Sequence, residues 1–260
     1  MLWRKCYDGW ENLNWKKSRQ SGRLSLVLSM LRLPSALSLV LLALVLATGS
    51  GVAKEVVPAA KVALDKWIAG QAGMESLQAT FVQERKLRAV RRPLVSNGRM
   101  WWRKDGGFRW EVGDPPKVVT IQATDGRVAN LKPHKLTAEL RSKEAAEEAM
   151  HGLGFGFSAF FDADPSAWEG KLELRDCYLA EDNPDHLVAE FGFREAKISA
   201  ALLKMVIIAD VGRSDLHQFL LVFRDTSSIL LSFDPMQKNV GIDDSMFTID
   251  LTGYKVKDKG

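Results

Sequence analysis

The chain has 260 residues, of which 36 are basic, 32 are acidic and 46% are hydrophobic. The basic excess lies ahead of residue 54, where seven basic residues stand against two acidic ones, so 54–260 holds 29 basic and 30 acidic residues and a formal net charge of −1. This balance removes the main electrostatic support for a nucleic-acid-binding protein. Of the two cysteines only Cys177 lies in 54–260, which excludes an internal disulfide there.

Residues 1–53 are predicted to be an N-terminal extension followed by a cleavable signal peptide. An uncharged apolar run, 33–47, follows Arg32 and precedes a stretch of small residues that ends at Ala53. A positive start, a short apolar core and a small-residue exit are typical of secretory signals. The apolar run is shorter than the roughly 20 residues of a spanning helix, and an anchor that is not removed is the alternative. No cysteine lies near the cleavage site to carry a lipid, and Met30 is a candidate for the true start.

Residues 54–260 are predicted to form a single domain, because they suffice for a sizeable core and no repeat or low-complexity linker indicates a second one. The domain begins with a predicted helix over 57–71. Leu64 and Trp67 recur there at helical spacing, and Pro58 suits the first turn. The apolar face of this helix needs a partner surface, because a lone helix of this length is marginal in water.

From Leu77 onward the apolar residues recur with a period of two, which indicates β-strands. Turn-forming residues such as those at 105–107 and 113–116 separate the strands. Short strands joined by short turns favour an antiparallel meander over a parallel α/β sheet. The strands are predicted over 77–87, 95–104, 108–112, 117–123 and 127–131, and again over 171–179, 186–193, 202–209, 216–223, 229–233 and 247–251.

A helical insert is predicted between the two sets of strands. Glu144–Met150 is strongly helix-forming, and Gly152–Phe161 is apolar, with glycines placed between phenylalanines. Pro165 can begin a further short helix. The predicted fold class is therefore mainly β (α+β), with an N-terminal helix, many antiparallel strands and a mid-chain helical insert.

The stretch Gly98–Trp110 has the strongest pattern in the chain. Side chains alternate across a strand, so Phe108 and Trp110 share one apolar face while Arg109 and Glu111 share the other. Together with the 117–123 strand and the phenylalanine-rich insert, this hairpin offers more bulky apolar surface than one helix covers. Two interpretations stay open, an ordinary solid core and a curved sheet that encloses an apolar cavity, because core and pocket share the same composition.

No catalytic or metal-binding constellation is found in the sequence. The four histidines are far apart, and no phosphate-binding glycine loop or Gly-x-Ser-x-Gly elbow is present. Nothing points to a base that would activate Cys177, so it is predicted to be a buried structural cysteine. We therefore expect no enzyme activity, no metal and no cofactor.

Several short motifs follow one another at a spacing that resembles the LolA-type periplasmic outer-membrane lipoprotein carriers. The resemblance is clearest between Leu64 and Pro133 and weakens through the insert. Its motifs are Phe81-x-Gln83, Gly98-Arg99-Met100-Trp101, Phe108-x-Trp110, Asp125-Gly126 and Leu131-x-Pro133.

This resemblance implies an incomplete antiparallel β-barrel, closed by helices, whose apolar cavity shields acyl chains. A carrier of this kind takes acylated cargo from an inner-membrane export complex and delivers it, across the periplasm, to an outer-membrane receptor. A monomer is expected. Candidate lipid-binding residues, taken from the matched motifs and their apolar neighbours, are Phe81, Met100, Trp102, Phe108, Trp110, Val119, Ile121, Phe155 and Phe157.

One part of the family pattern is missing. Carriers of this type usually have an Arg-Pro pair shortly before Phe-x-Trp, and its arginine holds a lid closed, whereas this chain has Lys104-Asp105 there, with Arg103 one residue earlier. Lysine lacks the planar fork of arginine, so Arg103 and Lys104 are only candidates for a lid latch. The lid itself is expected at Phe155–Phe161, or that segment is a rigid core helix.

Two other classes of function stay open. The domain could be a structural or sensory β-domain with a solid core that binds protein rather than lipid, since one fold serves many functions. A hydrolase would show turnover of ester substrates, which we do not expect.

Overall fold

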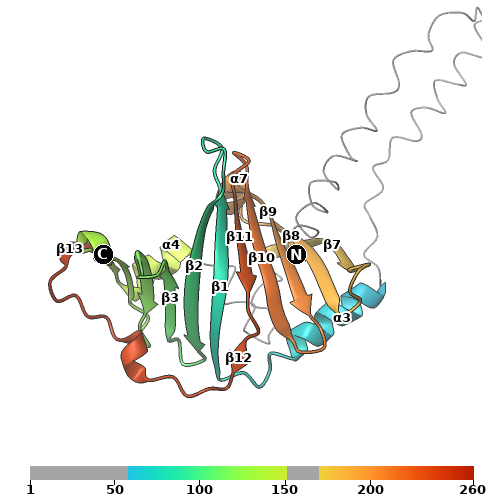
Figure 1. Cartoon of the computed structure of the whole chain (residues 1–260), viewed down its shortest axis with the longest axis horizontal. Coiled ribbons are helices and arrows are strands. Elements are labelled where there is room, and N and C mark those ends of the chain that lie inside the picture. The colour runs from blue at the N-terminus through green and yellow to red at the C-terminus, as the bar shows by residue number, and fades with distance from the viewer. Residues whose placement is uncertain (1–57, 151–169) are drawn as a thin grey trace, which may run out of the picture. The chain divides into compact units, whose positions relative to one another are not determined.

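The computed structural model describes residues 58–150 and 170–260, all of which belong to one compact unit (Figure 1). The fold class is mainly β, as predicted. Its strands are β1 (Ser76–Lys86), β2 (Leu94–Arg103), β3 (Phe108–Val112), β4 (Val118–Gln122), β5 (Val128–Lys132), β6 (Thr137–Arg141), β7 (Leu172–Leu179), β8 (His186–Phe193), β9 (Leu202–Asp210), β10 (Asp215–Phe223), β11 (Ser228–Phe233), β12 (Gln237–Lys238) and β13 (Lys255–Asp258). Its helices are α3 (Pro58–Ala69), α4 (Lys143–Met150), α7 (Ala196–Ala201) and the short 3-10 turns η1 (Pro133–Lys135) and η3 (Asp244–Phe247).

All thirteen strands belong to one open sheet. The order is β13-β6-β5-β4-β3-β2-β1-β11-β10-β9-β8-β7, with β12 attached to β1. Two antiparallel meanders, β1–β6 and β7–β11, are joined where β1 pairs with β11, for example at Phe81 and Phe233. β7 and β13 lie at the two ends of this order, which is why the barrel is incomplete in the part of the chain that is described. The predicted curved, incomplete antiparallel barrel is thereby confirmed in its architecture.

The predicted hairpin forms where the glycine-rich turn was expected. Gly106 has a φ of +100°, a left-handed conformation that costs glycine little. The N–H of Arg103 donates to the carbonyl oxygen of Gly107 at 2.8 Å, and the N–H of Gly107 donates to Oδ1 of Asp105 at 3.2 Å. The turn thus pairs Trp102 with Phe108 across β2 and β3 and sets the register of the hairpin.

One side of the sheet, named here the helix face, packs against α3. Leu64 and Trp67 of the helix belong to the same buried cluster as Leu77 on β1 and Ile207 on β9. The indole Nε1 of Trp67 donates to the backbone carbonyl oxygen of Asp215 at 3.3 Å, which ties the helix to the start of β10. The main core therefore extends from α3 across the middle strands toward β2 and β3.

The opposite side, named here the tail face, is covered at β4–β6 by the segment that leads from η3 to β13. Figure 1 shows this segment running outside the strands on that part of the sheet. Ile249, Leu251 and Tyr254 of this segment pack against a second buried cluster. The cluster consists of Val119, Ile121, Leu131 and Ala138, which come from β4, β5 and β6. The sheet therefore carries an apolar core on each side.

The strand predicted over 247–251 is wrong. Asp244–Phe247 forms η3, and the residues after it pack their side chains on the tail face instead of pairing with a strand. A real strand follows at Lys255–Asp258 and pairs with β6 in parallel, which no nearby turn signal indicates. The strand Thr137–Arg141 and the helix Ala196–Ala201 were also not predicted.

Candidate functional site

Five of the predicted lipid-binding residues meet on the helix face of β1, β2 and β3. We name them the aromatic strip, and they are Phe81, Met100, Trp102, Phe108 and Trp110. The register pairs Trp102 with Phe108 and Met100 with Trp110, so all four side chains share one face. The ring centroids of Phe81 and Trp110 are 4.0 Å apart with 24° between the planes, and those of Phe108 and Trp110 are 6.3 Å apart. The three rings form a continuous stack in which Phe81 of β1 reaches over β2 to Trp110 and Phe108 of β3.

Gly98 is the residue that permits this stack, and the sequence motif that contains it did not reveal why. It lies opposite Phe81 in the register of β1 and β2. A Cβ atom at position 98 would lie 2.1 Å from Cζ of Phe81 and 2.7 Å from the carbonyl oxygen of Glu111. The ring of Phe81 therefore lies over the glycine, in space that any other side chain would fill, and reaches Trp110.

Burial divides the aromatic strip into two parts. Phe81 is 2% exposed and Met100 is 0% exposed, and both belong to the core cluster that contains α3. Trp102, Phe108 and Trp110 are half-buried and pack at the margin of that cluster. The strip thus has a core-like base and a more accessible aromatic margin.

Val119 and Ile121 do not join the strip. They pair with Glu111 and Arg109, whose side chains point away from Trp110. Both are buried on the tail face under the C-terminal segment. The expectation that they line the same wall as Phe108 is corrected by this register, because positions that differ by one residue lie on opposite faces. Phe155, Phe157 and the expected lid at Phe155–Phe161 lie outside the described residues.

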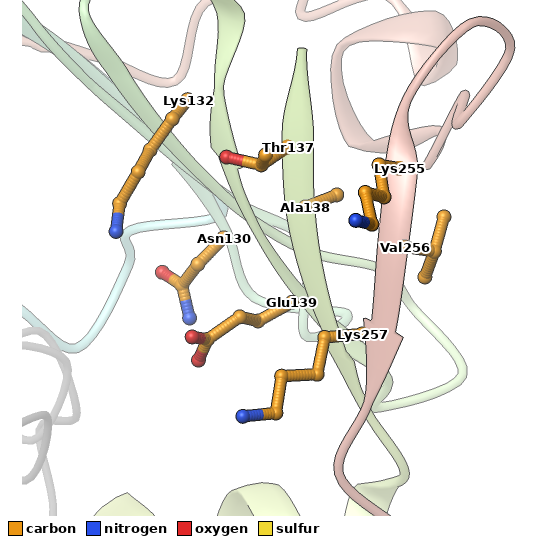
Figure 2. A pocket seen from close by; sticks show the side chains of 8 residues that line it. All are labelled: Asn130, Lys132, Thr137, Ala138, Glu139, Lys255, Val256 and Lys257. Atoms are coloured by element: carbon orange, nitrogen blue, oxygen red, sulfur yellow. The ribbon is translucent and has the colours of Figure 1, made fainter. Parts of the chain in front are cut away.

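Beyond β3 the helix face becomes polar. On β4 and β5 the neighbouring positions are Thr120 and Asn130, whose Oγ1 and Oδ1 atoms lie 2.7 Å apart in a hydrogen bond. A groove of about 430 Å³ follows at β5, β6 and β13, and Figure 2 shows Asn130, Lys132 and Glu139 directed to one side of it. The residues that line it are Asn130, Lys132, Thr137, Ala138, Glu139, Lys255, Val256 and Lys257. The apolar surface of the helix face is therefore bounded on this side by a polar one.

The two candidates for the lid latch make other contacts among the described residues. The guanidinium of Arg103 forms ion pairs with Asp105 (2.6 Å) and with Asp244, and lies 5.0 Å above the ring of Phe247. The hydrogen bonds that Arg103 donates to Asp105 and Asp244 raise the pKa of Arg103. The bond to Asp105 is also the main cause that lowers the pKa of that carboxyl group. Lys104 pairs with Glu75 at 2.9 Å. Arg103 thus attaches η3 to the hairpin on the tail face.

A buried ion pair network, not anticipated from the sequence, lies behind the aromatic strip. Oε1 and Oε2 of Glu111 accept hydrogen bonds from Arg109 at 2.8 Å and from Arg99 at 2.9 Å. Arg109 also donates to the carbonyl oxygen of Met246 at 3.2 Å. A buried carboxylate needs such partners, since an unpaired one is costly. The alternation of Arg109 and Glu111 with the aromatic residues was the available signal.

The described residues contain no group of three or more histidine, cysteine, aspartate or glutamate side chains that could hold a metal ion. Cys177 is buried, its Sγ lies 3.5 Å from the carbonyl oxygen of Ala60, and burial raises the pKa of its thiol to about 11. A thiol of this kind is a poor nucleophile near neutral pH. His186 and His217 stack with ring centroids 5.0 Å apart, and burial is the main cause that lowers the pKa of His217. Within 58–150 and 170–260 no helix is long and apolar enough to cross a membrane.

Neither a family model nor a curated protein sequence matches this chain. Among solved structures it is similar to an uncharacterized conserved protein from Thermus thermophilus, with a TM-score of 0.45, 11% identity, and coverage of 77% of this chain and 99% of that one. It is also similar to a putative outer membrane lipoprotein-sorting protein domain from Vibrio parahaemolyticus, with a TM-score of 0.42, 12% identity and coverage of 72% and 94%. A third is a LolA superfamily protein from Nitrosomonas europaea, with a TM-score of 0.38, 9% identity and coverage of 73% and 97%.

Proposed function

We propose that this chain is a non-catalytic periplasmic carrier that binds the acyl chains of lipoproteins, or of another acylated molecule, on the aromatic strip. The observation that carries the proposal is the half-buried margin of the strip, formed by Trp102, Phe108 and Trp110 beside a fully buried base. Aromatic rings that are neither in the core nor in water are suited to exchange contacts with an apolar ligand.

The size of the hydrophobic effect supports acyl chains as the ligand. Each methylene group removed from water contributes about 0.8 kcal/mol, so a chain with about ten buried methylenes gains about 8 kcal/mol gross. Binding costs offset part of this gain, which leaves a ligand that can be released. Polar groups of a ligand would find fewer hydrogen-bond partners on the strip than at Thr120 and Asn130, where the helix face carries polar side chains.

The cargo and its partners follow from the resemblance in the sequence and are part of the proposal. The carrier would take an acylated molecule from an inner-membrane export complex and deliver it to an outer-membrane receptor. The predicted signal peptide in 1–53 would bring the chain to the periplasm, where we expect a monomer.

Two adjacent tryptophans on β2 give a matched test. Trp102 lies on the helix face and Trp101 on the tail face, both are half-buried, and Trp101 lies 5.6 Å from the guanidinium of Arg99. Binding of a fluorescent fatty acid is titrated for the wild type, Trp102→Ala and Trp101→Ala. We expect Trp102→Ala to weaken binding about tenfold, which corresponds to about 1.4 kcal/mol, and Trp101→Ala to change it less than twofold.

A second variant tests the sign of the interaction. Phe108→Glu places a charge on the margin of the strip and should abolish fatty-acid binding while far-UV circular dichroism stays unchanged. Equal effects of Trp101→Ala and Trp102→Ala, or binding by Phe108→Glu, would contradict the proposal.

The alternative is a structural or sensory β-domain that binds protein and no lipid. One observation favours it: Phe81 and Met100 are fully buried and continuous with the core around α3. Native mass spectrometry of the wild type separates the two functions. A co-purifying acylated species supports the carrier, whereas a protein mass without ligand, together with no uptake of the fluorescent fatty acid, supports the alternative.

A further inference from the structure

The hairpin between β1 and β2 has a strongly basic end, which we name the basic tip and define as residues 85–95. The tip contains five basic residues and no acidic one, although 54–260 as a whole has a net charge near zero. All five basic side chains are exposed. They are Arg85, Lys86, Arg88, Arg91 and Arg92.

These cations differ from the arginines of β2 and β3 in forming no ion pair within the described residues, although Asp225 in the adjacent turn lies close enough to Arg88 to interact with it electrostatically. Among residues 58–150 and 170–260, none of the five forms an ion pair, whereas Arg99, Arg103 and Arg109 on β2 and β3 each pair with a carboxylate. Charges concentrated in this way attract a surface of opposite sign over about a Debye length, roughly 8–10 Å in physiological salt. With five cations and one nearby carboxylate, the tip therefore keeps a net positive field.

The same tip exposes apolar side chains. Val90 is 40% exposed, Leu94 is 49% exposed and Val95 is 62% exposed. Leu94 pairs with Arg85 and Val95 with Glu84, so the two apolar side chains point to opposite faces of the hairpin and neither reaches a core. In Figure 1 the hairpin lies at one end of the sheet, beside the turn between β10 and β11. The apolar groups thus lie at the end of the sheet rather than on one of its faces.

We propose that the basic tip docks on the surface of a bilayer that contains anionic phospholipids. Exposed cations attract the lipid phosphates, and apolar side chains on both sides of a narrow hairpin can enter the boundary between headgroups and acyl chains. A nucleic acid would use the cations but not Leu94 and Val95, which favours the bilayer. The same strand runs from the tip to Phe81 on the aromatic strip, but the docking proposal does not depend on what the strip binds.

The test is co-sedimentation of the full chain with vesicles of phosphatidylcholine alone or with 30% phosphatidylglycerol. Three arginines are replaced in Arg88→Glu/Arg91→Glu/Arg92→Glu, and a matched control makes the same charge change at exposed lysines of the sheet edge, in Lys255→Glu/Lys257→Glu/Lys259→Glu. Residues 1–57 are common to all variants, so differences between variants report the tip. Each cation near an anionic surface contributes about fivefold, so the tip variant should lose at least about 100-fold in partitioning to the anionic vesicles, and the control less than fivefold.

A second variant separates charge from apolar contact. Val90→Thr/Leu94→Thr/Val95→Thr keeps every charge and should lower partitioning about tenfold, with the loss persisting in high salt, where the electrostatic part is screened. Unchanged unfolding midpoints in urea show that the variants are folded. Equal losses in the tip variant and the lysine control, or wild-type binding that ignores phosphatidylglycerol, would overturn the proposal and would leave an acidic protein surface as the partner of the tip.

Discussion

The contact between Gly98 and Phe81 allows a quantitative test of how the aromatic strip is built. A methyl group at position 98 would lie 2.1 and 2.3 Å from two ring atoms of Phe81 and 2.7 Å from the backbone oxygen of Glu111. Real Cβ atoms do not approach other atoms this closely, so the ring and the strands must move apart. Gly98→Ala therefore disturbs the stack of Phe81 on Trp110 without removing any of its members.

The magnitude follows from three effects. Overpacking of a core costs about 1–3 kcal/mol. Loss of the aromatic pair costs about 0.5–1.5 kcal/mol. Alanine reduces the entropy of the unfolded chain relative to glycine and returns about 0.4–1 kcal/mol. We expect a net loss of about 1–3 kcal/mol, or a fall in Tm of about 2–4 °C for each kcal/mol in a domain of this size.

Urea unfolding followed by tryptophan fluorescence and circular dichroism measures this loss. Gly73→Ala is the matched control, because a Cβ atom there has no neighbour within 4 Å, and it should be neutral or slightly stabilising. In a double variant, Phe81→Leu removes the ring atoms that meet the methyl group, so Gly98→Ala should cost less there than in the wild type. Equal stabilities of Gly98→Ala and Gly73→Ala, or strict additivity with Phe81→Leu, would refute the packing argument.

Two further predictions concern the tail face and the buried thiol. Arg103→Gln should lower the free energy of unfolding by about 1 kcal/mol and loosen the attachment of η3 in limited proteolysis. The control is Arg127→Gln, which removes an exposed pair with Asp125 and should leave both readouts unchanged. Equal effects of the two substitutions would contradict the anchoring role of Arg103. Because burial raises the pKa of the Cys177 thiol to about 11, the thiol stays neutral at pH 8. A chromogenic disulfide should therefore react with it slowly in the native protein and rapidly in urea. Rapid reaction in the native protein would show that the thiol is accessible.

Local patterns in the sequence were sufficient for most of the strands. The period of two and the turn residues predict β1–β5 and β7–β11 to within about two residues of their observed ends, since both signals are local. The strand β6 was missed although its five residues also alternate, with Thr137 and Glu139 at the groove and Ala138 buried on the tail face. Its neighbour β13 was missed because a parallel partner more than a hundred residues away leaves no turn signal.

The candidate site was predicted in part, and its limit has a physical cause. Phe81, Met100, Trp102, Phe108 and Trp110 come together because their alternation and register can be followed from one strand to the next. On β4 the same face continues at Thr120, which pairs with Trp110, and not at Val119, which pairs with Glu111. Val119 and Ile121 therefore point to the tail face, away from the aromatic strip. They are apolar because the C-terminal segment packs against them there.

The two-sided core of β3 has a consequence for any experiment on the aromatic strip. Phe108 and Trp110 face the α3 side, while Arg109 and Glu111, in the same strand, are held by hydrogen bonds on the tail face. Truncating an aromatic side chain removes contacts from one side only, and the buried ion pair with its attached tail segment continues to position the strand. Loss of ligand binding can therefore be separated from loss of the fold at this site. Arg109 and Glu111 hold β3 in place, whereas the alternate residues Phe108 and Trp110 form the surface for the ligand.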